Sequence, residues 1–566
     1  MQILDHTIKN TQENTNNFLK KLQTAKRNGY DLFLAAVLSL AAVLITRVQF
    51  SGTVSGTAQE NYFKDFGISA VVLFCFLFAV LYLIIPVLDC GLYRCLHKIH
   101  SSADEEINPS KSMRFWAIVT AIAWLPYYLS YYPGGIYSDT FNSITYSLNR
   151  TLCNRHPLFY NFLIGLAIKL GNFVGQDLEW SMGFFLAVQM ILIEIELIYF
   201  LRFMITHGIH RKVRTWIMIF MTFFPLIPIY AVSVWKDTPF AMAFMLWFMF
   251  AIDLYLEIRK GEWHLKTLAG FIIGLFLVAF TRNNGIYVIA FVAAAFIVLT
   301  FTCRFFTKNL IVYGTLLLSV MMIAVIQGPG YRRMGVIPTD IVEDIGIPIN
   351  QICSVVVHDG HITPAQKESI NRFIPYDNIE EYFKPCVVDS IKWYADMDWG
   401  YLELHKAEFW DLWKHLLLQN PQIYFEEYLL ETLGFWNVDV SGSNGYAMVE
   451  VWNNDYGLTQ TDYFERIFGF SFQHFVNPRQ YISCAWFFWF FFICMIFTMK
   501  HYGFRNCCLF MPQMAVWLTL MVATPIAISL RYVSPLLFTI PFVVIVPMIL
   551  EREIKPDRKE TADESH

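Results

Sequence analysis

Long apolar runs separated by short polar gaps dominate this sequence. A helix needs about 20 apolar residues to cross a hydrocarbon core of ~30 Å, and runs of roughly 16 to 22 residues recur along the chain. The pattern predicts an all-α polytopic membrane protein with about 12 transmembrane helices. The runs lie near residues 30–46, 68–88, 115–132, 181–201, 215–233, 238–256, 266–281, 286–302, 309–327, 481–499, 508–528 and 533–550.

A further run, Pro157–Gly171, is too short to place by length, because as a helix it reaches only ~22 Å at ~1.5 Å per residue. The charges of the neighbouring loops decide whether this run crosses the membrane. Lys and Arg favour cytoplasmic loops, and the twelve-span count puts every basic cluster on that side, including the cluster from Arg202 to Arg214. A crossing at 157–171 would export that cluster, so we interpret this run as an interfacial or re-entrant helix.

With an even number of twelve crossings, both termini are expected in the cytoplasm and the long segment 328–479 outside the membrane. That segment is less hydrophobic and predicts a small, mainly helical extracytoplasmic domain. The expected divisions are a cytoplasmic N-terminal segment 1–29, a transmembrane hairpin with a cytoplasmic linker 30–114, a transmembrane core 115–327 with an outer loop 133–180, the domain 328–479, C-terminal transmembrane helices 480–550 and a cytoplasmic tail 551–566.

Composition supports a membrane protein and narrows its partners. The chain is 56% hydrophobic and only 16% charged, whereas a soluble protein carries about 25% charge. The net charge of −4 is unconcentrated, and no basic stripe alternates with aromatic residues, so nucleic acid is not an expected partner. The cysteines form no CxxC pair, which argues against a thiolate zinc site. Cys353 and Cys386 share the exported segment, and whether they pair is open.

The stretch YYPGGIYSDTFNSITYSL follows the third predicted span and places Asp139 just outside the bilayer. A carboxylate in a partly dry, aromatic-rich pocket can accept a proton from a hydroxyl group. Asp139 is therefore the candidate catalytic base. The alternative is that it caps the helix that follows, since Asp is a common N-cap.

Two further groups of polar residues emerge on the same predicted side. His156 precedes Pro157, and it can orient Asp139, touch a phosphate or simply face solvent. Lys236 and Asp237 sit in a short connection between two spans. They form either a local charge pair or a substrate contact, with Lys236 as a phosphate ligand and Asp237 as a second acid or metal ligand.

Arg282 in TRNNG and Arg531 in LRYVSP each stand at the outer end of a predicted span. Arginine binds phosphate oxygens in a bidentate fork and stays charged. These residues are candidate phosphate ligands, although snorkelling to lipid headgroups explains many single interfacial arginines. Tyr532 is expected in the interfacial aromatic belt.

The exported segment offers a density of aromatic and acidic residues around Trp393 and Trp399. Aromatic faces beside carboxylates and amides are a usual means of holding a sugar. Gln351, Asp396 and Asp398 are therefore acceptor-site candidates, with an ordinary domain core as the alternative.

The motifs PGGIYSDTFNS, RHP, VWKDTPF and IPINQ, in this order and on one side of the membrane, resemble the GT-C superfamily of integral-membrane glycosyltransferases. The likeness is to bacterial, polyprenyl-phosphate-sugar dependent members and covers about residues 115–550. Several relatives carry a paired acidic motif in the first loop, whereas this chain has Asp139 alone. That difference weakens a case for metal dependence, so no cofactor is firmly expected and a divalent metal stays open.

The resemblance implies a sugar donor carried on a polyprenyl phosphate and an acceptor that is an envelope polymer, lipid or protein. Transfer would occur on the outer face of a bacterial cytoplasmic membrane with inversion. Asp139 would be the general base or an acceptor-binding group, and Arg282, Arg531 and Lys236 would hold the leaving phosphate. Membrane lipids would be the surrounding partners.

Two other functions remain open. A secondary transporter or lipid-linked glycan flippase would also have about twelve spans, and it would carry charges near mid-membrane. Most charges here lie at the ends of predicted spans, with Glu194 and Glu196 as the exceptions. A lipid-linked glycan polymerase would differ from the transferase in its donor.

Overall fold

The computed structural model describes residues 27–101, 108–301, 309–440, 449–476 and 482–554. Most of the expected cytoplasmic segment 1–29 and tail 551–566 therefore lies outside the described residues. Within the described part the chain is almost entirely helical, as predicted, and β-structure is limited to one two-stranded ribbon, β1 (Val48–Gln49) with β2 (Tyr62–Phe63), and isolated bridges.

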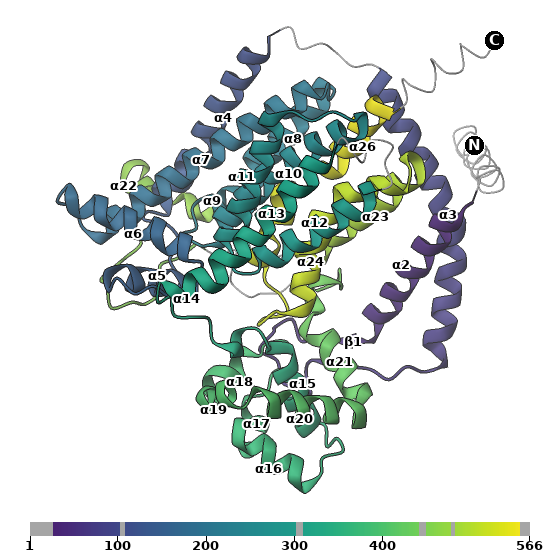
Figure 1. The fold of residues 1–566 in the computed structure, drawn as a ribbon, viewed down its shortest axis with the longest axis vertical. Helices are drawn as coiled ribbons and strands as arrows, with labels where there is room; N and C mark the ends of the chain where they lie inside the picture. The colour runs from purple at the N-terminus through teal and green to yellow at the C-terminus, as the bar shows by residue number, and fades with distance from the viewer. Residues whose placement is uncertain (1–26, 102–107, 302–308, 441–448, 477–481, 555–566) are drawn as a thin grey trace, which may run out of the picture.

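A large bundle of helices forms the upper part of the molecule in Figure 1. Its first members are α2 (Gly29–Arg47), α3 (Ile68–Ser101), α4 (Pro109–Ser130), α5 (Ser138–Leu148), α6 (Leu158–Phe173), α7 (Leu178–Thr206), α8 (Arg211–Phe223), α9 (Leu226–Ala231), α10 (Asp237–Lys260), α11 (Leu265–Thr281), α12 (Gly285–Phe301) and α13 (Leu310–Val325). The chain returns to it through α22 (Tyr463–Phe468), α23 (Ala485–Tyr502), α24 (Met511–Val522), α25 (Ser534–Thr539) and α26 (Phe542–Ile554), with short 3-10 segments at Leu433–Phe435, Phe472–His474, Phe504–Phe510 and Leu530–Val533.

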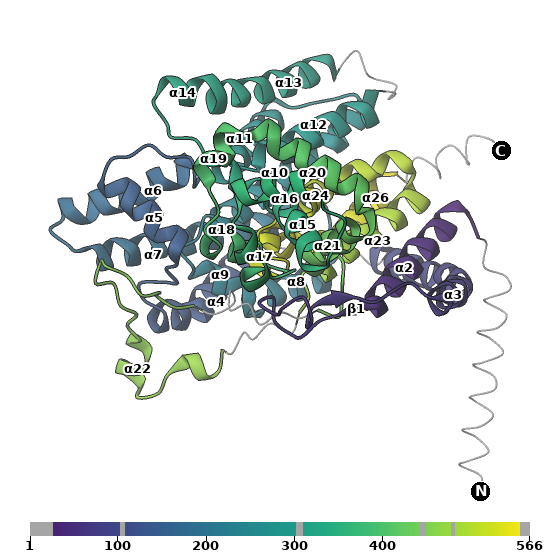
Figure 2. The same cartoon turned by 90° about the horizontal axis from the view of Figure 1, so that it is seen from below.

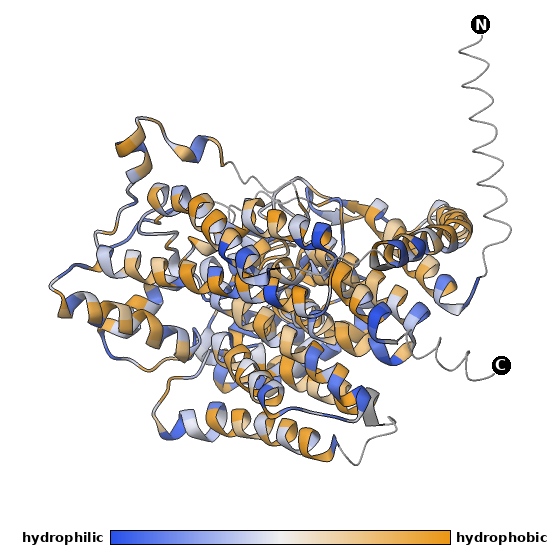
Figure 3. Cartoon of the chain, turned by 90° about the horizontal axis from the view of Figure 1, so that it is seen from above, coloured by the Kyte–Doolittle hydropathy of each residue, from blue (hydrophilic) through white to orange (hydrophobic). Residues whose placement is uncertain are grey.

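Seven helical segments of the described chain are long and apolar enough to cross a membrane: Gly29–Arg47, Ile68–Ile99, Leu178–Thr206, Asp237–Lys260, Leu310–Arg333, Ala485–Tyr502 and Leu530–Glu553. The other expected spans correspond to shorter or more polar helices, among them Leu265–Thr281 and Gly285–Val298. The run expected to be interfacial or re-entrant forms the short apolar helix Leu158–Phe173. Apolar residues cover most of the bundle in Figure 3. On α3, for example, Ile68, Val71, Val72 and Phe76 are all more than half exposed, as side chains that face lipid are. The protein is a multi-pass helical membrane protein.

Two runs predicted as single spans are broken by proline. The run 215–233 divides into α8 and α9 at Phe224–Pro225, and the run 533–550 divides into α25 and α26 at Ile540–Pro541. Proline lacks the amide proton that an interior helix position donates, and its ring clashes with the preceding turn. Hydropathy registers neither effect, which is why the runs looked continuous.

The segment that follows α13 forms a separate helical domain at the lower end of Figure 1. It contains α15 (Gly346–Val357), α16 (Pro364–Phe373), α17 (Tyr376–Tyr382), α18 (Asp389–Tyr394), α19 (Trp399–Leu404), α20 (Lys406–Gln419) and α21 (Pro421–Glu431), with a 3-10 turn at Ile341–Glu343. The π-helical turn at Ile326–Gly330 and α14 (Tyr331–Arg333) instead continue α13 at the bundle (Figure 2). The domain's own hydrophobic core draws on residues between Val342 and Tyr424. Several described residues beyond this core belong instead to the bundle core, among them Leu429, Leu433, Trp436, Val449 and Leu458. The domain's own core therefore covers only part of the expected range 328–479.

The N-terminal hairpin α2–α3 leans against the side of the bundle (Figures 1 and 2). It is fastened by Lys500 of α23, whose Nζ lies 2.6 Å from Asp31 Oδ1 and 2.8 Å from Asp89 Oδ2. His501 adds a contact of 2.9 Å from Nε2 to Asp89 Oδ2. One cation thus neutralises carboxylates of both hairpin helices, and Asp31 is only 2% exposed.

We expect Lys500→Met to destabilise the protein strongly, because it leaves two largely buried carboxylates without their cation. Removing one partner of a buried pair costs about 3–5 kcal/mol. The measurement is the thermal unfolding midpoint of the purified protein in detergent. The matched control is Lys260→Met, which breaks the pair with Glu553 at a lysine side chain that is 57% exposed, where the expected cost is only about 0–1 kcal/mol. Equal shifts for the two variants would contradict this assignment.

Candidate functional site

The PGG loop between α4 and α5 is held by backbone pairing on both sides. Gly135 N donates to Val232 O at 2.9 Å, and Val234 N donates to Gly135 O at 2.8 Å. Gly134 has a φ of +111°, and a Cβ there would lie 3.0 Å from the Val234 side chain and 3.1 Å from Val232 O. Glycine is required at this position by both conformation and space, and the close approach places α5 beside the segment that carries Lys236.

The segment 232–236 is also fixed from the other side. Val234 O accepts hydrogen bonds from Thr140 Oγ1 and, at 3.0 Å, from Tyr160 Oη. Trp235 then stacks on Tyr137, with ring centroids 3.9 Å apart. These buried contacts fix the position of Lys236 next to α5.

Asp139 is the centre of the charged cluster. Its Oδ2 lies 3.2 Å from Lys236 Nζ and 3.1 Å from Arg531 Nη1. Helix α5 begins at Ser138, and its N-cap Tyr137 makes no side-chain cap, so the N-cap interpretation of Asp139 is wrong. The carboxylate instead joins two cations that come from segments about 100 and 390 residues away.

These cations set the ionisation of Asp139. Burial alone would raise the pKa of this carboxyl group, but the charges of Lys236 and Arg531 hold the pKa well below its ordinary value. Asp139 is therefore a carboxylate at every physiological pH. In this state it serves as counter-ion to two cations and is a weak proton acceptor.

His156 contacts Lys236 and not Asp139. Its Nδ1 lies 2.8 Å from Lys236 Nζ, so the expected orientation of Asp139 by His156 is exerted only through the lysine. Burial, with the charge of Lys236 added, lowers the pKa of His156 to about 3. The ring is neutral, and because Nδ1 faces an ammonium group we assign it as the acceptor and Nε2 as the protonated nitrogen. Nε2 is buried without a hydrogen-bond partner in the described part of the chain.

Arg282 and Asp237 form a second ion pair beside the first. Arg282 Nη1 donates to Asp237 Oδ1, and the Asp237 side chain is 1% exposed. The Arg282 guanidinium also lies 5.3 Å from the ring centroid of Tyr532. Asp237 therefore forms an ion pair, as one of the two interpretations expected. Its partner is Arg282, however, and not its sequence neighbour Lys236.

Tyr532 lies between the two arginines. Arg531 Nη2 donates to Tyr532 Oη at 3.0 Å, and the Tyr532 residue is 6% exposed. The expectation that Tyr532 belongs to an interfacial aromatic belt is wrong, because its ring is enclosed by protein. Arg531 in addition lies 5.3 Å from the centroid of the Trp235 ring, so aromatic faces support the guanidinium that reaches Asp139.

A chain of charges connects this cluster to the helical domain, and sequence reasoning missed it. Arg155 Nη2 bonds Glu343 Oε1 at 3.0 Å, and Glu343 Oε2 bonds Lys392 Nζ at 3.0 Å. Lys392 also lies 3.4 Å from Asp389 Oδ1. Burial, which Lys392 opposes and Glu343 reinforces, raises the pKa of Asp389. The only available sequence signal was the position of Arg155 directly before His156.

The acceptor-site candidates of the helical domain have structural partners instead. Gln351 is buried, donating to Tyr424 O at 3.0 Å and accepting from Trp413 Nε1 at 2.9 Å. Asp398 caps α19 through Tyr401 N at 2.7 Å. Asp396 accepts from Asn378 Nδ2 at 3.3 Å. The structure does not bring these three residues to the Asp139 cluster.

A different part of the segment 328–479 does reach the site. Ile136 N donates to Glu450 O at 2.9 Å, Trp452 N donates to Ile136 O at 3.0 Å, and the Trp452 ring packs edge-on to Tyr137. Trp452 is 38% exposed. The sequence VWNND around it resembles the aromatic and amide composition that singled out Trp393, so the same signal could have found it.

The described residues contain neither a disulfide between Cys353 and Cys386 nor a cluster of metal ligands. Cys353 and Cys386 are both buried free thiols. No group of three His, Cys, Asp or Glu side chains in this part of the chain is arranged to hold a metal ion. The Asp139 and Asp237 carboxylates are each paired with a cationic side chain.

Residues 147–562 match one protein family, described as a family of unknown function (DUF6020). The chain belongs to this family. The matched region contains His156, Lys236, Asp237, Arg282 and Arg531 but begins after Asp139. No curated protein matches the chain, and no solved structure does.

The neutral state of His156 predicts a pH dependence of stability. Below about pH 6.5 the unfolded chain binds a proton at this ring that the native protein does not, so stability falls as the pH drops. We expect His156→Asn, which keeps an acceptor near the Nδ1 position, to remove a slope of at most about 1.4 kcal/mol per pH unit. The measurement compares unfolding midpoints of both proteins between pH 7.5 and 4.5. Parallel curves would contradict the assignment.

Proposed function

We propose that this protein is a membrane glycosyltransferase that moves a sugar from a polyprenyl-phosphate donor to an acceptor in the cell envelope. The observation that carries the proposal is the meeting of Asp139, Lys236 and Arg531 at one point, at the end of a helical membrane bundle. A lipid-linked sugar phosphate presents a phosphate at membrane depth beside a reactive sugar carbon. The cluster offers two cations for that phosphate and one carboxylate for an attacking hydroxyl group.

In the proposed reaction, an acceptor hydroxyl oxygen attacks the anomeric carbon and forms the new glycosidic bond. The bond from that carbon to the phosphate oxygen breaks, and the electron pair leaves with the polyprenyl phosphate. Lys236 and Arg531 stabilise the charge on the departing phosphate. The hydroxyl proton passes to Asp139, which acts as general base. Attack opposite the leaving group inverts the anomeric configuration, and no metal is part of this scheme.

The donor itself would prepare Asp139 for this step. A phosphate competes with Asp139 for Lys236 and Arg531 and brings negative charge close to the carboxylate. Both effects raise the pKa of the carboxyl group from its depressed starting value. Asp139 would thus change from a counter-ion into a usable base only when the donor is bound. Arg282 and Asp237 would support the site by holding Tyr532 against Arg531.

We also propose how the chain is arranged across the membrane. The chain would cross a bacterial cytoplasmic membrane twelve times with both termini inside, and the cluster and the helical domain would face outward. The positive-inside distribution of Lys and Arg supports this arrangement. The saccharide, lipid or protein acceptor would approach between the bundle and the domain, where Trp452 and the Arg155–Glu343–Lys392 chain border the cluster.

A lipid-linked glycan flippase could use the same cations, and Glu196 of α7, which is 8% exposed, is the buried acid that such a protein could employ. The two functions differ at Asp139. Transport needs no base to take up a proton from a hydroxyl group, whereas transfer does.

We expect Asp139→Asn to abolish transfer while leaving affinity for polyprenyl phosphate equal or higher, because the amide no longer competes for Lys236 and Arg531. Transfer is measured as release of polyprenyl phosphate from a synthetic polyprenyl-phosphate hexose, with membranes of a deletion strain as the acceptor source. Affinity is measured by native mass spectrometry of the purified protein. Arg531→Gln should weaken binding at least ten-fold.

The matched control is Asp177→Asn. Asp177 caps α7 through Trp180 N at 2.8 Å, and asparagine caps equally well, so activity should persist. Full transfer by the Asp139→Asn protein would exclude Asp139 as the base. Loss of transfer together with loss of donor binding would show that the carboxylate only organises the cations.

A further inference from the structure

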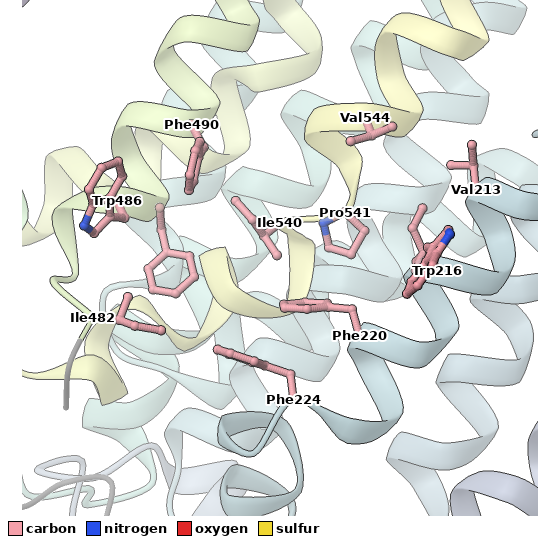
Figure 4. Close-up of a pocket in the computed structure, with 12 residues that line it drawn as sticks. Val213, Trp216, Phe220, Phe224, Ile482, Trp486, Phe490, Ile540, Pro541 and Val544 are labelled. Atoms are coloured by element: carbon pink, nitrogen blue, oxygen red, sulfur yellow. The ribbon is translucent and has the colours of Figure 1, made fainter. Parts of the chain in front are cut away.

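An open apolar groove runs along the bundle between α8, α23 and the break between α25 and α26 (Figure 4). Its volume is about 740 Å³. One wall is a single face of α8, which presents Val213, Trp216, Phe220 and Phe224 among its lining residues. In Figure 4, Trp486 of α23 stands opposite Trp216, and Ile540 and Pro541 lie between them.

The proline break builds the floor of this groove. Helix α25 ends at Thr539 and α26 begins at Phe542, so Ile540 and Pro541 form an irregular step where a continuous helix would present regular ridges. Broken helices at membrane depth are usually found where the chain lines a cavity or a binding site. The lining residues are aliphatic or aromatic, and the hydrogen-bonding side-chain groups among them are the indole N–H groups of Trp216 and Trp486, so the groove offers little to a polar ligand.

Two segments that line the groove continue along the chain to the charged cluster. From Phe224 the chain enters α9 and reaches Lys236 within twelve residues, and from Ile540 it runs back through α25 to Arg531 within nine. Helices α9 and α25 also contact each other. The wall and the floor of the groove are thus direct extensions of the segments that carry the two cations.

A third connection closes the gap between them. Helix α23, which carries the lining residues Trp486, Phe487 and Phe490, packs against α25. Helix α25 packs in turn against the 3-10 turn Leu530–Val533 that carries Arg531. The walls of the groove therefore pack against the segments that carry the two cations.

We propose that this groove binds the isoprenoid chain of the donor, with the phosphate at Lys236 and Arg531 and the first isoprene units along α8. This inference rests on the proposed function and extends it from the headgroup to the tail. From Phe224 to Val213 the wall of α8 rises ~16 Å at ~1.5 Å per residue. The volume falls within the ~300–1,000 Å³ typical of ligand sites. A ligand with an anionic head and a long apolar tail matches both ends of the path.

The test uses the full-length protein in nanodiscs and an undecaprenyl phosphate that carries a diazirine within its first four isoprene units. After photolysis, mass spectrometry of peptides locates the adduct. We expect labelling on 211–224, 482–490 or 540–544, and we expect excess undecaprenyl phosphate to suppress it. Labelling elsewhere, or no labelling, would overturn the proposal. So would equal labelling of the groove by a diazirine phosphatidylglycerol, because ordinary lipid would then be the occupant.

A variant pair tests the same point by affinity. Val544→Trp fills the groove from a side chain that is 41% exposed, and it should lower undecaprenyl phosphate binding at least ten-fold. The control Val188→Trp alters α7 at a similar exposure of 38%, outside the groove, and should leave binding unchanged. Equal binding by both variants would overturn the proposal.

Photolabelling and the transfer assay test the tail site and the transferase activity separately. Groove labelling without any sugar transfer would keep the tail site and reject the transferase. Sugar transfer with adducts mapped to another helix would keep the transferase and reject the tail site.

Discussion

The site depends on one electrostatic constraint: charges at the edge of an apolar bundle must be neutralised by partners within reach. Asp139 is paired with both Lys236 and Arg531, whose two charges it neutralises in part, and Asp237 is paired with Arg282. These pairs connect four segments that are distant in sequence, so they organise the site before any ligand arrives. A ligand that binds these cations must compete with the carboxylate for them, and anions are the class of ligand able to do so. The proposed phosphate ligand is of this class.

The helical domain joins this cluster by its own charge chain and by backbone pairing. Arg155, Glu343 and Lys392 connect the residue before His156 to helix α18. Val388 N donates to Pro525 O at 3.1 Å, and Ala527 N donates to Cys386 O at 2.9 Å, just ahead of Arg531. The domain is thus tied to both sides of the cluster, next to His156 and next to Arg531. The position of the helical domain and the positions of the Lys236 and Arg531 side chains therefore depend on each other.

Much of this organisation could be predicted from sequence, because hydropathy and charge act locally. Apolar runs indicated a multi-pass helical protein, and the convergence of the segments around Asp139, Lys236, Arg282 and Arg531 followed from counting crossings. Which cation pairs with which carboxylate did not follow, since Lys236 bypasses its neighbour Asp237 for Asp139. The burial of Tyr532 and the structural roles of Gln351, Asp396 and Asp398 depend on tertiary packing, which residue type alone does not reveal. Proline breaks within apolar runs were missed because hydropathy averages over them.

The broken helices have a mechanical consequence. Helices α9 and α25 are each six residues long and are separated from α8 and α26 by the prolines at 225 and 541. A rigid span would transmit any tilt along its whole length to its terminal side chain. Here α9 and α25 pack against each other, and α9 leads directly into the buried framework around Tyr137 and Trp235. The positions of Lys236 and Arg531 therefore follow from contacts of these two short helices, and the axes of α8 and α26 do not fix them.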